Sequence, residues 1–254
     1  MCSVKSNDAL KSEGQADWMG AESGRFHASL SSCLHAMGQP LTVLRCTVAA
    51  SAVEGIATEK LHRHLGTSAE QVQLLCGLFD CMRDLVDSGR FDGERSPVEV
   101  SQLFSFVVEE QMPSLQASGL AIDVRIPAEL QSTMLADMNR SLKALTSVLK
   151  IAASVSVQGD AIEVTAAPKH GGVELIVQNE RAHRGSFTSL ERMCLEVAEA
   201  NIRSQGGDIV CGGDPFRVSM TLPVQSPDHN RVMSIVQLKG MKARYEALAS
   251  PFCA

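Results

Sequence analysis

Two runs of apolar residues at alternating spacings of three and four constrain the fold of this chain most strongly. The first run consists of Leu30, Leu34, Met37, Leu41, Leu44 and Val48. The second run consists of Val72, Leu75, Phe79, Met82 and Val86. This spacing returns to the same side of an α-helix at each step, which is the heptad pattern of helices that pack against other helices. The sequence therefore predicts two amphipathic helices, the first over about residues 24–53.

The stretch between the two runs predicts a short connection, and hence an antiparallel helical hairpin. Residues 54–66 are less regular, and Thr67 or Ser68 followed by Glu70 is typical of a helix start, with a capping side chain and an acid in the first turn. One hairpin buries a single seam, whereas a twofold dimer of hairpins makes a four-helix bundle. The alternative is that the hairpin packs on a second domain of its own chain. We favour the dimer because both seams are regular.

A second pattern begins after the break at residues 88–93, where helical and extended segments alternate. We expect helices over Val98–Leu115, Met138–Val155 and Phe187–Ser204, the first with Pro97 at its N-terminus and the last ended by Gly206 and Gly207. We expect strands over Leu120–Ile126, Ala161–Ala166, Val173–Val177, Asp208–Cys211 and Arg217–Leu222. This order predicts helices on one face of a mixed sheet, an α/β sandwich. In the tail, Val232–Val236 is a candidate strand and Lys242–Ala249 a candidate helix.

The overall composition limits the function classes. The 254 residues are enough for two domains, and the net charge of −6 argues against a nucleic-acid partner, which calls for a basic face. The apolar stretches are too short to span a bilayer, and the chain does not open with a charged segment followed by an apolar one. We therefore expect a cytoplasmic protein that binds neither nucleic acid nor membrane.

The chain contains eight cysteines, and their spacing gives no metal or redox motif. There is no C-x-x-C pair and no clustering with histidines. Most of the cysteines lie inside apolar periodic segments, where a thiol serves as a small buried hydrophobe. The sequence thus favours structural thiols over a metal centre or a redox pair.

The segment Leu34–Thr42 reads Leu-His-Ala-Met-Gly-Gln-Pro-Leu-Thr. It resembles the phosphoacceptor box of bacterial sensor histidine kinases, H-E-x-x-x-P-L, often written H-E-x-x-Q-P-L-T. The matching residues are His35, Gln39, Pro40, Leu41 and Thr42. The domain that follows resembles the ATP-binding domain of that family in its order of elements, so the resemblance covers about residues 25–223.

The resemblance implies an α+β architecture in which a two-helix hairpin forms a four-helix bundle on dimerisation and is followed by a histidine-kinase-like α/β sandwich. We accordingly divide the chain into four parts. They are a disordered lead-in (1–20), the hairpin for dimerisation and phosphoacceptance (21–90), a degenerate ATPase-like sandwich (96–226) and a C-terminal tail (227–254).

His35 has the chemistry that the resemblance implies. It lies one residue from the seam, at the flank of the predicted bundle, and neutral imidazole is a good nucleophile near pH 7. Pro40 cannot donate a hydrogen bond to the carbonyl of Ala36, so we expect the helix to bend one turn after His35. The alternative is a half-buried surface histidine beside an ordinary kink. We expect the remaining histidines to be solvated: His27, His62, His64, His170, His183 and His229.

The chain departs from the kinase pattern directly after His35. The family places there an acid that takes the proton as the imidazole attacks ATP, and this chain has Ala36. A methyl group cannot accept a proton, so we expect autophosphorylation to be crippled.

The nucleotide-binding boxes of the family are replaced as well. Val148 and Ala152 stand where the family has Mg²⁺-holding Asn residues, and Mg²⁺ requires oxygen ligands. The D-x-G-x-G box aligns with Asn179 and Arg181, where Asn179 could still accept a hydrogen bond. The glycine-rich phosphate cradle aligns with Leu190–Cys194, in which Glu191 would repel phosphates. We therefore expect the chain to use neither ATP, nor a metal, nor another cofactor.

These features lead to a hypothesis with two rivals. The first is a histidine phosphotransferase that moves phosphoryl groups between His35 and receiver-domain Asp residues of response regulators, with Gln39 as a secondary candidate that could orient a hydrolytic water. The second is a non-catalytic pseudo-histidine-kinase that binds a receiver or a kinase and regulates it. A working kinase with unusual boxes ranks third. Replacing His35 with Ala should abolish function under the first hypothesis and preserve it under the second.

Overall fold

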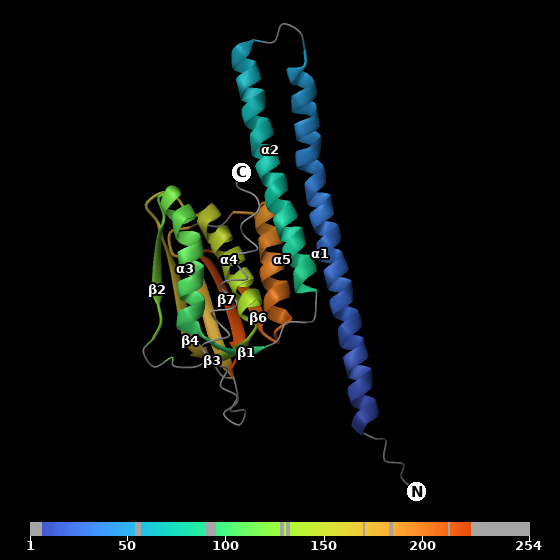
Figure 1. The fold of residues 1–254 in the computed structure, drawn as a ribbon, viewed down its shortest axis with the longest axis vertical. Coiled ribbons are helices and arrows are strands. Elements are labelled where there is room, and N and C mark those ends of the chain that lie inside the picture. The colour runs from blue at the N-terminus through green and yellow to red at the C-terminus, as the bar shows by residue number, and fades with distance from the viewer. Residues whose placement is uncertain are drawn as a thin grey trace, which may run out of the picture.

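The computed structural model describes residues 7–53, 57–89, 95–127, 130, 133–169, 171–182, 185–212 and 214–224, with side chains from residue 24 onward. Two long helices, α1 (Asn7–Ser51) and α2 (Thr58–Ser88), form a hairpin. The end of the hairpin where α1 leads into α2 projects beyond the rest of the protein (Figure 1). The remaining elements form a sandwich beside the other half of α2. The predicted architecture of a helical hairpin and an α/β sandwich is confirmed.

Both helices of the hairpin begin earlier than the sequence pattern indicates. Residues 7–20, expected to be disordered, belong to α1, and Thr67 and Ser68 lie inside α2 rather than at its start. Residues 7–20 contain no proline and several residues of high helix propensity, so the helix extends beyond the heptad seam. The helical structure of α2 over Thr58–Gly66 likewise does not require an apolar residue at every heptad position.

The sandwich consists of one main sheet, one small ribbon and three helices. The strands of the main sheet run in the order β2-β4-β5-β7-β6, and only the β2–β4 pair is parallel. The bounds of these strands are β2 (Ala121–Arg125), β4 (Ala161–Lys169), β5 (Gly172–Asn179), β6 (Asp208–Gly212) and β7 (Phe216–Pro223). The helices are α3 (Val100–Ala117), α4 (Met138–Val155) and α5 (Ser189–Arg203), and they cover one face of the sheet (Figure 1).

The segment at Pro97 differs from the prediction. Ser96–Glu99 is a short strand, β1, which pairs antiparallel with β3 (Thr133–Ala136), and α3 begins only at Val100. Pro97 pairs with Leu135 in this two-stranded ribbon. A proline cannot donate to a ladder but is tolerated in an edge strand. The expectation of a proline-started helix was therefore wrong, and β3 was not anticipated at all.

A continuous core joins the sheet, its helices and the hairpin. Helix α4 buries Val148, Leu149 and Ala152, while α2 contributes Leu78 and Leu85 to the same cluster. The inner side of α2 therefore packs against the sandwich of its own chain, mainly against α5. The candidate elements of the tail, Val232–Val236 and Lys242–Ala249, lie outside the described residues. Within the described part of the chain, no helix has both the length and the apolarity needed to cross a membrane.

Candidate phosphoacceptor site and its flanking domain

His35 lies on the solvent-facing side of α1. Its side chain is exposed, as are Gln39 and Thr42 on the same face. Gly38 lies beside them, and a Cβ added to it would meet nothing within 4 Å. The surface around the imidazole therefore has no bulky neighbour at Gly38 and is open to solvent, in agreement with the flank position predicted from the seam.

Pro40 is buried on the side of α1 that faces away from this surface. The helix nevertheless continues through it to Ser51. Two residues further on, the hydroxyl of Thr42 donates to the carbonyl of Gly38 at 2.8 Å. This is the bond of a threonine to the carbonyl four residues before it, whereas the carbonyl that Pro40 leaves without an N–H donor is that of Ala36.

Ala36 occupies the position of the catalytic acid of the family, and its surroundings suit a methyl group. The residue is half-buried and packs against the hydrophobic core, unlike the neighbouring exposed His35. A carboxylate there would be partly withdrawn from water, which disfavours its charged form. The missing acid therefore agrees with the way α1 packs.

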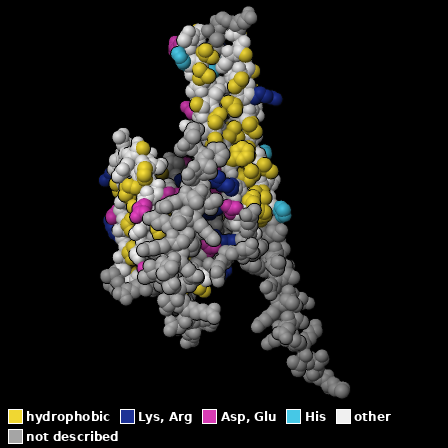
Figure 2. Space-filling model, viewed as in Figure 1, with side chains coloured by type: hydrophobic (Ala, Val, Ile, Leu, Met, Phe, Trp, Pro, Cys, Tyr) yellow, Lys and Arg dark blue, Asp and Glu magenta, His cyan; other side chains and the backbone are white. Residues whose placement is uncertain are grey.

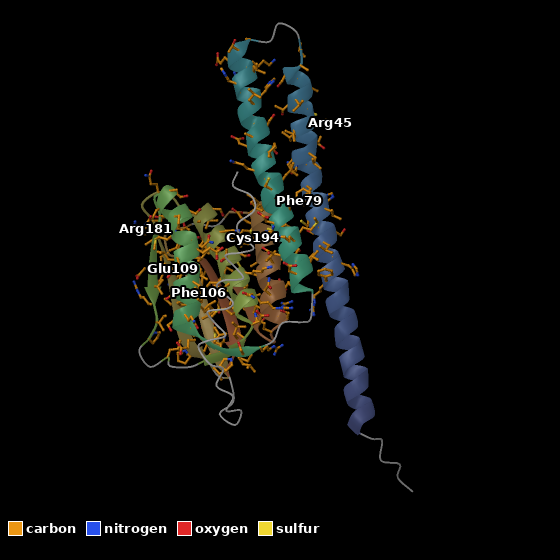
Figure 3. The ribbon with its side chains drawn as sticks, viewed as in Figure 1. Arg45, Phe79, Phe106, Glu109, Arg181 and Cys194 are labelled. Atoms are coloured by element: carbon orange, nitrogen blue, oxygen red, sulfur yellow. The ribbon has the colours of Figure 1, made fainter. Side chains whose placement is uncertain are left out.

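Half of the predicted seam is exposed. Met37 and Leu75 are buried, whereas the other heptad position on each helix is open to solvent, with exposed fractions between 40% and 61%. We call these exposed residues the apolar stripe: Leu34, Leu41 and Val48 of α1, and Val72, Phe79 and Val86 of α2. Figure 2 shows the hydrophobic side chains gathered along the hairpin, and Figure 3 labels Phe79. The stripe lies next to His35 in sequence, because Leu34 precedes it.

The positions that correspond to the metal-holding amides are part of the core. Val148 and Ala152 of α4 are both 0% exposed. They offer no oxygen ligand, and no solvent reaches their side chains. Both residues serve hydrophobic packing at this end of α4, and neither can hold Mg²⁺.

Asn179, at the adenine-reading position, directs its hydrogen bonds to the protein itself. Its amide nitrogen donates to the hydroxyl of Ser156 at 2.7 Å and to the carboxylate of Asp160 at 3.1 Å, and its amide oxygen accepts from the backbone of Arg181 at 2.9 Å. The backbone N–H of Val157 also donates to Asp160. This bond and the one from Asn179 lower the pKa of Asp160. Arg181 is exposed at the turn after β5 (Figure 3).

The N-terminus of α5, where a phosphate cradle would lie, is closed by the chain's own carboxylate. Thr188 and Glu191 form a capping box, with Thr188 N–H donating to Glu191 at 2.7 Å and Glu191 N–H donating to the Thr188 hydroxyl at 3.2 Å. The second carboxylate oxygen of Glu191 accepts from Ser154 of α4 at 2.7 Å. A helix N-terminus attracts anions, and at α5 the carboxylate of Glu191 occupies that position.

Cys194, the last residue of the degenerate cradle, faces the hairpin instead of a ligand. It is 5% exposed, and its sulfur lies 3.8 Å from that of Cys81 on α2. Next to this pair, a Cβ on Gly77 of α2 would lie 3.1 Å from Leu190 of α5. The two helices are therefore in close contact along this line.

Polar contacts extend the junction between hairpin and sandwich. Lys143 of α4 forms ion pairs with Asp84 and Asp87 of α2, each at 2.9 Å. Burial alone would lower the pKa of Lys143, but the hydrogen bonds and charges of the two aspartates outweigh it and raise the pKa. Arg140 donates to the carbonyl of Ser88 at 3.0 Å. Sequence reasoning did not predict that Lys143 and Arg140 contact α2. The only local signal for this junction was Gly77, a glycine inside the apolar pattern of α2, which allows close packing of α5.

The predictions for the cysteines and histidines held in part. Cys33, Cys81 and Cys194 are buried and Cys211 is half-buried, but Cys46 and Cys76 lie on exposed sides of α1 and α2. Among the histidines, His27 and His62 are exposed, while His64 is half-buried and its ring nitrogen lies 3.1 Å from the hydroxyl of Ser51. His170, His183, His229, Cys2 and Cys253 lie outside the described residues.

Solved structures share this arrangement of hairpin and sandwich. The histidine kinase AdeS of Acinetobacter baumannii superposes with a TM-score of 0.54 at 16% identity, over 76% of this chain and 98% of that chain. The chain has a histidine-kinase-like fold. At this level of identity the likeness concerns the fold alone, and the resemblance seen in the sequence is confirmed to that extent.

Two further structures align with lower scores. A histidine kinase from Burkholderia phymatum STM815 has a TM-score of 0.45 at 15% identity, over 76% of this chain and 97% of that chain. Full-length ShkA, solved with AMPPNP, has a TM-score of 0.49 at 15% identity, over 77% of this chain and 46% of that chain. No protein-family model matches the histidine-kinase-like chain, and no curated protein matches it either.

Proposed function

We propose that this protein is a histidine phosphotransferase of a two-component phosphorelay, which carries phosphoryl groups on His35 and does not use ATP. The observation that carries the proposal is the contrast between two sites. The histidine of the phosphoacceptor box is exposed on an open helix face, whereas the nucleotide-binding positions are filled by the protein's own side chains.

The transfer needs only a nucleophile from this chain. A ring nitrogen of His35 attacks the phosphorus of a receiver aspartyl phosphate, the bond between phosphorus and the Asp oxygen breaks, and the electron pair returns to the Asp carboxylate. The reverse reaction delivers the group to a second receiver. The receiver contributes its own acidic pocket and Mg²⁺, so an acid at position 36 and a metal site in this chain are both unnecessary.

The filled nucleotide site supports the ATP-independent form of the proposal. Val148 and Ala152 have no side-chain oxygen with which to hold Mg²⁺. The amide of Asn179 is hydrogen-bonded to Ser156 and Asp160, and Glu191 would repel a phosphate at the start of α5. Gln39, exposed one turn beyond His35, is a secondary candidate for orienting a water that hydrolyses the phosphoryl group.

We propose further that the protein works as a cytoplasmic homodimer, in which the apolar stripe of one hairpin packs on that of a second copy. The stripe recurs every seven residues on both helices, which is the period of a coiled-coil seam. Two hairpins joined along it make a four-helix bundle. His35 borders the stripe but faces outward, so it would stay accessible to a receiver.

The decisive experiment is a transfer assay with purified proteins. Receiver domains from the source organism are phosphorylated with labelled acetyl phosphate, freed of the donor, and mixed with wild type, His35→Gln or His62→Gln. His62 is an exposed histidine of the same hairpin and serves as the matched control. We expect acid-labile label on wild type and on His62→Gln, and none on His35→Gln.

The same assay tests the rival functions. Label on wild type from γ-labelled ATP alone would overturn the ATP-independent proposal. Tight receiver binding that is equal in wild type and His35→Gln, with no label on either, would instead identify a non-catalytic pseudo-histidine-kinase. The half-buried Ala36 and the sandwich docked on α2 are compatible with that alternative.

A further inference from the structure

Three buried thiols gather where the hairpin meets the sandwich. Cys33 comes from α1, Cys81 from α2 and Cys194 from α5, with exposed fractions of 0%, 7% and 5%. The sulfurs of Cys81 and Cys194 lie 3.8 Å apart, although 113 residues separate them in sequence. Figure 3 places Cys194 on the part of α5 that lies beside α2.

Cys33 differs from the other two thiols. It donates to the carbonyl of Leu78 at 3.4 Å, and burial together with the nearby charge of Glu196 raises its pKa. A protonated thiol bonded to the backbone is a structural group. Among the described residues, no group of three His, Cys, Asp or Glu side chains is placed to hold a metal, so the cluster is not a metal site.

The surroundings of the pair favour a thiolate on Cys194. The hydrogen bond with Cys81 lowers the pKa of Cys194 and burial opposes it. The ammonium of Lys150 lowers the pKa further, whereas the carboxylates of Glu191 and Asp84 raise it. The same hydrogen bond and burial raise the pKa of Cys81. The two sulfurs share one hydrogen bond in which either can be the donor. When Cys81 holds that proton, Cys194 is the thiolate that acts as the nucleophile, with Cys81 as its resolving partner.

We propose that Cys81 and Cys194 are a reversible thiol–disulfide site that, when oxidised by a peroxide, covalently ties the helical hairpin to the sandwich. The site is independent of phosphotransfer on His35. It goes beyond the packing role predicted for these cysteines, because their proximity exists only in the folded chain.

The reaction is balanced with hydrogen peroxide as the oxidant. The Cys194 thiolate attacks one peroxide oxygen, forming an S–O bond and breaking the O–O bond, and the departing hydroxide becomes water on protonation. Cys81 then attacks the sulfur of the sulfenic acid, so that the S–S bond forms, the S–O bond breaks and a second water leaves. In total, two thiols and one peroxide give one disulfide and two waters.

The two sulfurs are already in van der Waals contact. To form the bond they must approach from 3.8 Å to about 2.05 Å. Because both thiols are nearly buried, a small oxidant is favoured over a bulky disulfide reagent. The bond would close a loop that contains most of the sandwich, and so would hold the domain against α2.

The test is a map of the thiols in the folded, full-length protein. Wild type is treated with hydrogen peroxide, remaining thiols are alkylated, and the peptides are analysed by mass spectrometry before and after dithiothreitol. We expect a Cys81–Cys194 linked peptide, a loss of two free thiols and a reversible loss of two hydrogens in intact mass. Cys81→Ser and Cys194→Ser should abolish the link, whereas Cys46→Ser and Cys76→Ser, which replace exposed thiols, should retain it.

A second readout does not depend on the variants. Oxidised wild type should melt at a higher temperature than reduced wild type, and dithiothreitol should remove the difference. The proposal is overturned if Cys81 and Cys194 stay alkylatable under conditions that oxidise Cys46 and Cys76, or if the disulfide joins Cys33 instead. Neither result bears on His35, so this proposal and the proposed function fail separately.

Discussion

At the scale of residues, Asn179 and Asp160 form a buried hydrogen-bonded pair between the end of β5 and the start of β4. The amide of Asn179 bonds to Ser156, Asp160 and the backbone of Arg181, so its donor and acceptor groups are all engaged within the protein. Asp160 is 4% exposed and accepts from both Asn179 and Val157. A buried carboxylate with such partners keeps its charge, because hydrogen bonds to the charged form favour it.

Asp160→Asn should lower the stability of the protein at pH 7 and weaken its dependence on acid. The folded-state pKa of Asp160 lies below the unfolded value of about 3.9, so its contribution is present above that value and is lost as the pH falls through the folded pKa. Urea unfolding at pH 7, 5 and 3 measures this. The control is Glu180→Gln, an exposed acid of the neighbouring turn. If Asp160→Asn loses as much stability on acidification as wild type does, the Asp160 carboxylate is not the group that stabilises the fold.

At the scale of elements, α2 is the helix on which the two parts of the molecule meet. One face carries Leu78, Cys81 and Leu85 into the shared core, and another face carries the exposed residues of the apolar stripe. Gly77 allows α5 to approach closely, because any side chain there would meet Leu190. A helix with two apolar faces is suited to packing on two partners at once.

Gly77→Leu should destabilise the protein by about 1–3 kcal/mol, because the added side chain must displace Leu190 from a packed junction. Gly66→Leu is the matched control on the same helix, where a Cβ meets nothing within 4 Å. It should stabilise by roughly 0.5–1 kcal/mol, since leucine has the higher helix propensity. Urea unfolding of both variants checks the contrast. Equal effects would show that α2 and α5 do not pack at Gly77.

Lys143 links α4 to α2 through two aspartates, and Lys143→Met should cost about 1 kcal/mol at pH 8, a value limited by partial exposure of the pair. Its pKa is raised in the folded state. The contribution is therefore complete below the unfolded value of about 10.4 and is lost as the pH rises through the folded value. Unfolding curves from pH 8 to strongly alkaline pH should converge for wild type and variant. Lys60→Met, at an exposed site of α2, should change little.

For the whole molecule, the apolar stripe is the main apolar surface that stays exposed in the part of the chain that the structure describes. It follows α1 and α2 on the open side of the hairpin, while the sandwich covers α2 elsewhere (Figure 2). A contiguous apolar surface of this kind marks an interaction site. Its seven-residue period fits a second copy of the same hairpin better than an irregular partner.

Phe79→Glu and Leu41→Glu should each weaken self-association by roughly tenfold or more, about 1.4 kcal/mol, because a charge would be buried in the seam. Light scattering coupled to size exclusion and sedimentation equilibrium measure the effect. Val210→Glu is the control, since Val210 is 57% exposed but lies on edge strand β6 of the sandwich. A monomeric wild type, or equal weakening by Val210→Glu, would refute the seam.

The sequence by itself determined the features that local periodicity encodes. The heptad spacing predicted the hairpin, the alternation of segments predicted the sandwich, and the bounds of α4 agree with the pattern residue for residue because it is strongly amphipathic. The position of His35 one step from the seam predicted its exposure. The identities of Val148, Ala152 and Glu191 already argued against nucleotide binding, because that argument needs residue types and not their partners.

The tertiary structure alone decided which distant residues meet. The β1–β3 ribbon depends on a pairing between separate segments, and so Pro97 was misplaced in a helix. The heptad spacing marks both positions of each pair as apolar, but only the packed chain shows that one of them is buried and the other exposed. The Cys81–Cys194 contact and the ion pairs of Lys143 join residues far apart in sequence. Periodicity fixes which face of a helix is apolar, but only the packed chain determines what lies against that face.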